Sequence, residues 1–209
     1  MGNYNYEFRA LGSYKNELFK LLTNVGENKL CEYLIDVLMP VMEDERLDKV
    51  TNFVGSPVEG SVVCNDNGIE EIVRLKRHLF DVPFVYTTVT DTRNVICIDT
   101  NISRSNQSIK EMDINIYVMC HRQSLELDYE TRTKYRKLGY IGRNRLDIAV
   151  ALIGDILNGS SEFGIGHLRP NQMSPVRSYF PNNDFFGKVI TYTCSDFMAN
   201  YSEKSDVDG

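Results

Sequence analysis

The chain has 209 residues, of which 42% are hydrophobic and 25% are charged, and its formal net charge is −6. This composition is ordinary for a folded globular protein, and the length is enough for a sizeable core without disulfides. The acidic balance argues against a dedicated nucleic-acid-binding protein, which normally carries a basic surface.

The first quarter of the chain is predicted to be helical. Apolar residues recur at helical spacing from Tyr14 to Val25, with Ser13 as an N-cap. A second helix is predicted to start at Asn28, and Pro40 should kink or end it. Residues 42–50 are charged and compatible with more helix.

The middle of the chain is predicted to form a sheet. Residues 58–64 fit either a short strand or part of an ordered loop, and residues 69–79 are ambiguous. Three antiparallel strands are then predicted over residues 84–89, 94–100 and 109–121. The last strand alternates strictly, and one of its faces should be buried. The residues expected on that buried face are Met112, Ile114, Ile116, Val118 and Cys120.

One strongly apolar helix dominates the second half of the chain. Asn144 is a good N-cap for a helix over residues 145–157, and Asn158 and Gly159 are a good stop. The helix is apolar on almost all sides, so it should lie either deep in the core or against a second subunit.

The segments around this helix are less regular. Residues 123–145 are polar, and residues 160–184 are predicted to be long and irregular. A last strand is predicted over residues 187–194.

Together these elements predict an α+β fold: an antiparallel sheet of about four or more strands with flanking helices and a helical N-terminal part. No linker splits the chain, so residues 1–197 should form a single domain. Residues 1–50 would be its helical part and residues 80–197 its sheet and central helix, followed by a flexible C-terminal tail over residues 198–209.

The cysteines and the apolar runs indicate a cytoplasmic protein. The sequence has five cysteines and no CxxC pair, which favours reduced, buried thiols over disulfides or a structural zinc site. The N-terminus does not resemble a secretion signal, and no apolar run approaches the ~20 residues of a membrane span.

No catalytic motif stands out. GxSxG, HExxH and Walker sequences are absent, so neither an enzyme nor a cofactor or metal is expected. His78 is predicted to be a surface residue, and alternation points Cys120 and His121 to opposite faces of a strand. A nuclease with scattered carboxylates stays open as an alternative. Its residues would be Glu70, Glu71 and Lys76, or Asp99, Glu111 and Asp113.

Residues 132–145 form a stretch that resembles nucleic-acid-binding segments, because basic residues interleave with two tyrosines that could stack on bases. These residues are Lys134, Tyr135, Arg136, Lys137, Tyr140, Arg143 and Arg145. Acidic Asp128 and Glu130 precede the stretch, which favours a loop that pairs with a neighbouring copy of the chain. A nucleic-acid-binding module remains the alternative.

The segment 160–184 carries many aromatic residues among glycines and prolines, which is typical of a surface that docks on another protein. From these two regions we expect eight partner-contact residues. They are Phe163, Ile165, His167, Arg169, Tyr179, Phe180, Arg136 and Arg143.

The order of the elements resembles the tail terminator and head–tail joining (neck) proteins of long-tailed bacteriophages. The resemblance covers roughly residues 80–197 and rests on the local amino-acid sequence of five segments. These segments are residues 95–99, 114–121, 145–149, 163–166 and 190–192.

The resemblance implies a structural virion protein that forms a closed homo-oligomeric ring, most simply a hexamer. Such a ring would lie between the tail tube or sheath and the head connector, and DNA would pass through it without specific binding. It implies no enzymatic activity, no cofactor and no membrane contact, and assembly in the host cytoplasm. The resemblance transfers no individual functional residue.

Overall fold

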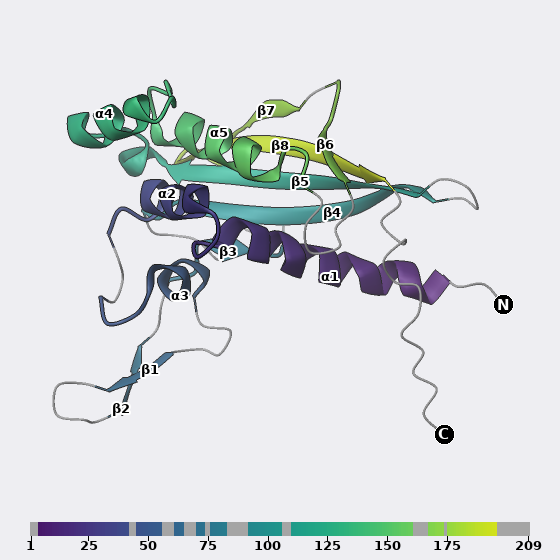
Figure 1. Ribbon diagram of the computed structural model, residues 1–209, viewed down its shortest axis with the longest axis horizontal. Coiled ribbons are helices and arrows are strands. Elements are labelled where there is room, and N and C mark those ends of the chain that lie inside the picture. Colours follow the sequence, from purple (N-terminus) through teal and green to yellow (C-terminus); the bar gives the residue numbers. More distant parts are fainter. Residues whose placement is uncertain are drawn as a thin grey trace.

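The computed structural model confirms an α+β fold, with five α-helices and a six-stranded mixed sheet (Figure 1). It describes residues 4–41, 45–55, 61–64, 70–73, 76–82, 92–105, 110–160, 167–173 and 175–195. The helices are α1 (Tyr4–Thr23), α2 (Lys29–Leu38), α3 (Lys49–Val54), α4 (Tyr129–Lys137) and α5 (Arg145–Leu157), and the 3-10 turn η1 covers Arg122–Ser124.

The main sheet has the strand order β3-β4-β5-β8-β6, and β7 also pairs with β8. All of its pairs are antiparallel except β3 with β4, which are parallel. A separate hairpin is formed by β1 (Ser61–Cys64) and β2 (Glu70–Val73). The other strands are β3 (Leu79–Phe80), β4 (Val95–Ser105), β5 (Lys110–His121), β6 (His167–Pro170), β7 (Val176–Tyr179) and β8 (Phe185–Ser195).

Three of the four predicted strands are confirmed, and β4 and β8 run longer than predicted. The predicted strand over residues 84–89 lies outside the described residues. The prediction of an irregular segment over residues 160–184 is wrong, because β6 and β7 pair with the two halves of the same edge of β8. They form one interrupted edge strand, whose gap contains Pro175.

The main core lies between one face of the sheet and helices α1, α2 and α5. Alternate residues of β4, β5 and β8 enter it, as the pattern of β5 predicted, and Ile114 and Ile116 are fully buried. Helix α5 lies over β5 and β8, and α2 packs against it. The structure therefore covers the apolar sides of α5 within one copy of the chain, and no second subunit is needed to bury it.

The opposite face of the sheet, called here the helix-free face, carries no described helix. At the end nearest α4 it is apolar, with a small buried cluster of Val95, Cys97, Met119 and Phe185. Towards the other end it turns polar, starting at Asp99 of β4. This division of one face into an apolar and a polar part positions the groups discussed below.

Candidate protein-contact surfaces

Helix α4 stands at one end of the sheet and was not predicted (Figure 1). It begins at Asp128, whose carboxylate accepts hydrogen bonds from the backbone N–H of Thr131 at 2.8 Å and from its hydroxyl at 2.6 Å. The Thr131 hydroxyl and the backbone N–H lower the pKa of Asp128. Asp128 thus acts as a helix cap. The sequence had instead suggested that this residue pairs with a neighbouring copy of the chain.

One side of α4 is fixed to the body of the protein. The Tyr135 hydroxyl donates to the backbone oxygen of Tyr33 at 2.7 Å, and Lys134 forms an ion pair with Asp36 at 3.2 Å. Tyr135 is only 1% exposed, so its ring cannot stack on a base. The helix is consequently a rigid element whose other side faces solvent.

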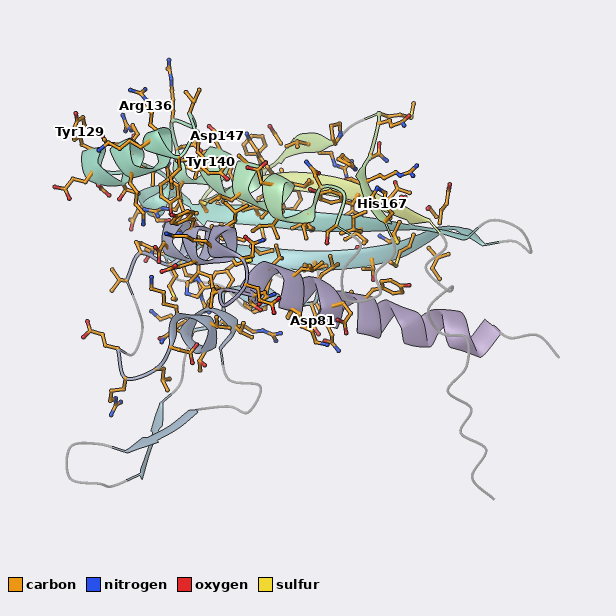
Figure 2. The ribbon with its side chains drawn as sticks, in the orientation of Figure 1. Asp81, Tyr129, Arg136, Tyr140, Asp147 and His167 are labelled. Carbon is orange, nitrogen blue, oxygen red and sulfur yellow. The ribbon has the colours of Figure 1, made fainter. Side chains whose placement is uncertain are left out.

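The outward side of α4 and the loop after it combine apolar and basic side chains. Tyr129 is 82% exposed and Ile141 is 76% exposed, and Figure 2 shows Tyr129 and Arg136 pointing away from the body. Exposed apolar groups with a charged border are typical of protein-contact surfaces. We call this surface the α4 patch, and it consists of Tyr129, Arg136, Lys137, Leu138, Ile141 and Arg143.

Arg145 does not belong to this surface, although the sequence grouped it with the basic residues nearby. It is only 6% exposed, and its guanidinium donates to the backbone oxygens of Ser124, at 2.7 Å, and of Val37. Arg145 therefore ties the start of α5 to η1 and to α2. Because Arg145 and Tyr135 are buried, one cation and one aromatic ring of residues 132–145 are not available to bind a nucleic acid.

Gly142 lets the loop after α4 pass close to the first turn of α5. A Cβ at this position would lie 2.9 Å from the Cβ of Asp147 and 2.9 Å from Cγ1 of Ile148. We expect Gly142→Ala to lower the free energy of unfolding by about 1–3 kcal/mol, because the loop must shift to relieve the overlap. Thermal melts would measure the loss. Gly26→Ala is the control, since no heavy atom lies within 4 Å of its added Cβ.

The edge formed by β6 and β7 is partly closed to further strand pairing. Gly159 N–H donates to the backbone oxygen of Leu168 at 3.2 Å, and Leu168 N–H donates to that of Ser160 at 3.1 Å. Pro170 has no N–H to offer. A partner would therefore bind this edge mainly through side chains.

Several side chains along this edge are exposed. Met173 is 97% exposed and Phe180 is 65% exposed. Tyr179 is half-buried and packs edge-on against Tyr117 of the helix-free face, with 5.2 Å between ring centres. We call this surface the edge strip, and it consists of His167, Arg169, Met173, Val176, Arg177 and Phe180.

The eight predicted partner-contact residues fall into four groups. Arg136 and Arg143 belong to the α4 patch, and His167, Arg169 and Phe180 belong to the edge strip, all of them exposed (His167 is labelled in Figure 2). Tyr179 serves mainly as packing. The remaining two, Phe163 and Ile165, lie outside the described residues.

The histidine and cysteine environments favour structural roles. The prediction of a surface His78 is wrong, because the residue is 4% exposed, stacks on Phe53 and contacts the backbone oxygen of Asn94 through Nδ1 at 2.7 Å. Burial raises the pKa values of the Cys97 and Cys120 thiols to about 12 each, so both are protonated at neutral pH and are poor nucleophiles. As predicted, Cys120 faces the main core and His121 the other side, against Phe185.

Three further observations concern ligands. Among the described residues, no group of three or more His, Cys, Asp or Glu side chains could hold a metal ion. A hollow of about 190 Å³ lies where α1 and α5 end, and the side chains of Asn24, Asn28 and Asn158 contribute to its lining. No described helix has the length and apolar character needed to cross a membrane.

Exposure is the feature that sequence reasoning missed at this site. Leu138 and Ile141 follow a polar helix and carry no periodic signal, so nothing in the sequence separates them from core residues. For Met173, the proline and glycine content of its segment suggested a loop. Its place beside β8 follows only from pairing between distant strands.

A comparison with known proteins matches the chain to a protein family. The model of a family described as YomW matches residues 16–194, which includes the main sheet and all five helices at least in part. The family takes its name from a gene of the SPbeta phage region of Bacillus, which connects it with phage-derived proteins. No curated protein and no solved structure matches the chain.

Proposed function

Because the chain belongs to the YomW family, and is therefore a phage-associated protein, we propose that it is a structural protein of the virion neck. In this proposal, copies of the chain form a closed ring of six that terminates the tail tube. The ring joins the tube or sheath to the head connector and has no enzymatic activity and no cofactor. It is assembled in the host cytoplasm, makes no membrane contact and remains in the virion.

The observation that carries the proposal is the clustering of exposed apolar side chains. Of the large apolar residues that are exposed in the described part of the chain, most fall within the α4 patch or the edge strip. Exposed groups of this kind are costly in water and mark contact surfaces. A ring subunit needs more than one such surface, because it contacts neighbours as well as the components above and below it.

Within the proposed ring, the edge strip is the surface for the tail or head partner. Its backbone is partly blocked against strand pairing, whereas Met173 and Phe180 project into solvent. The net charge of −6 would repel the phosphate backbone, so DNA could pass through the ring without binding.

We expect the double variant Met173→Asp with Phe180→Asp to fold and to keep the oligomeric mass of the wild type, but to fail in joining. A charged group at each position removes the apolar contact without entering the core. Complementation of a phage that lacks the gene, followed by electron microscopy, would show heads and tails accumulating apart. Point variants are preferable to deleting residues 164–178, because that deletion would remove β6 and part of β7.

The matched control is Val25→Asp with Val41→Asp, two exposed valines outside both surfaces. This variant should support joining. Joining by the edge-strip variant would contradict the assigned role of that surface. A wild-type protein that stays monomeric even with tail tubes as template would contradict the ring, and metal-dependent cleavage of DNA would put a nuclease in its place.

A further inference from the structure

The polar part of the helix-free face holds a compact acidic group. Asp99 of β4 lies opposite Asn115 of β5, and Asn101 lies opposite Asp113, while Thr191 and Thr193 of β8 continue the two rows. Because side chains alternate along a strand, all six project from the same face. We call these residues the acidic patch.

The two carboxylates of the acidic patch each accept a hydrogen bond from a neutral side chain. Asp99 accepts a hydrogen bond from Asn101 at 3.2 Å, and Asp113 accepts one from the Thr193 hydroxyl at 3.2 Å. Neither carboxylate forms an ion pair with any residue that the structure describes. They are diagonal neighbours, which lie roughly 7–8 Å apart in an antiparallel pair, and like charges at such positions repel each other. A bound cationic group would relieve that repulsion.

The α4 patch supplies the complementary charge. Arg136, Lys137 and Arg143 are exposed and form no ion pair within the described part of the chain. Lys134 on the same helix differs from them, because it is paired with Asp36. The patch therefore offers three free cations around the apolar side chains of Leu138 and Ile141.

The two patches cannot meet within one copy of the chain. The acidic patch occupies the first half of β5, whereas α4 follows the end of that strand, after η1 (Figure 1). From Asp113 to His121 the strand covers eight steps, or roughly 27 Å at about 3.4 Å per residue. Complementary surfaces at opposite ends of a subunit generate a head-to-tail contact, which repeats from copy to copy and forms a ring when the rotation between copies closes.

We propose that the α4 patch of each copy docks on the acidic patch of the next copy. Arg136 and Arg143 then lie against Asp99 and Asp113, and the threonines and asparagines of the patch form its polar border. The inference rests on the proposed ring and adds to it the pair of surfaces that holds the ring together. Arg169 and Arg177 of the edge strip project from the same face as the acidic patch and remain free for the tail or head partner.

Charge reversal followed by mixing tests the contact. In the variant Arg136→Glu with Arg143→Glu, the α4 patch and the acidic patch are both acidic. In the variant Asp99→Lys with Asp113→Lys, both surfaces are basic. We expect native mass spectrometry to show each variant alone as a monomer. An equal mixture should regain the wild-type mass, because each acidic surface then meets a basic one in an alternating ring. The contact should also weaken as salt is raised.

The control is Lys20→Glu with Lys29→Glu, an equal change of charge at two exposed positions outside the α4 patch, the edge strip and the acidic patch, which should keep the wild-type mass. If the lysine variant fails to fold, Asp99→Asn with Asp113→Asn replaces it and should raise the concentration for half-assembly at least tenfold. If the charge-reversed variants assemble like the wild type, or if the control does not assemble, the proposed docking surfaces are wrong. The proposed ring is not affected by either result. A wild-type protein that is monomeric at every concentration, and also with tail tubes as template, overturns the ring itself.

Discussion

Ile114→Asp is expected to unfold the protein, whereas Asn115→Asp should leave the fold intact. Ile114 is fully buried in the main core, and burial of an unpaired carboxylate costs several kcal/mol, comparable to a typical total stability of ~5–15 kcal/mol. Asn115 faces the other side of the strand, where its side-chain oxygen accepts a hydrogen bond from the Thr191 hydroxyl at 3.0 Å.

Thermal melts followed by circular dichroism would measure both variants. The aspartate at position 115 keeps the acceptor oxygen for Thr191, so its melting temperature should stay close to that of the wild type. It also adds a third carboxylate to the acidic patch, which makes an effect on assembly possible without an effect on folding. Equal, small effects of the two substitutions would contradict the register of β5.

Arg145→Met is expected to cause the second large loss of stability. The substitution keeps an unbranched, flexible side chain but leaves the backbone oxygens of Ser124 and Val37 without their donor. Each buried, unsatisfied acceptor costs about 1–3 kcal/mol. Removing the guanidinium also removes the cost of desolvating its charge, which offsets part of that loss. We expect a net loss of about 3 kcal/mol, which for a chain of this size lowers the melting temperature by roughly 10 °C.

Arg136→Met is the matched control, because it makes the same chemical change at an exposed position of α4. It should change the melting temperature little. Arg145→Lys should recover only part of the stability. The lysine side chain is shorter, and its ammonium group cannot donate to both carbonyls in the geometry of the planar guanidinium. If Arg145→Met melted like the wild type, Arg145 would not be the link between α2, η1 and α5.

The elements with a strong local pattern were determined by the sequence alone. The strict alternation of β5 fixed both its existence and its buried face, because a period of two leaves only one way to hide Ile114 and its neighbours. Helix α5 was equally clear, since Asn144 caps it as predicted, with its side chain accepting from the N–H of Asp147 at 2.8 Å. The class of fold follows from these two patterns.

Helix α4 and the edge strand needed the tertiary structure. Helix α4 buries only Tyr135, so its sequence has no apolar stripe, and what fixes it is a hydrogen bond to Tyr33 and an ion pair to Asp36, far away in the chain. Strands β6 and β7 are short and interrupted by a proline, and only pairing with β8 holds them extended.

The candidate surfaces divide in the same way. The sequence could point to Arg136, Arg143 and Phe180 because charge and aromatic content are visible residue by residue. It could not separate Arg143 from Arg145, two positions apart, of which one is exposed and the other binds buried carbonyls. It grouped Asp99 with Asp113 only as one of two candidate carboxylate sets, and the register between β4 and β5 is what makes them diagonal neighbours. Local pattern determines which elements form, whereas exposure and proximity depend on how distant elements pack.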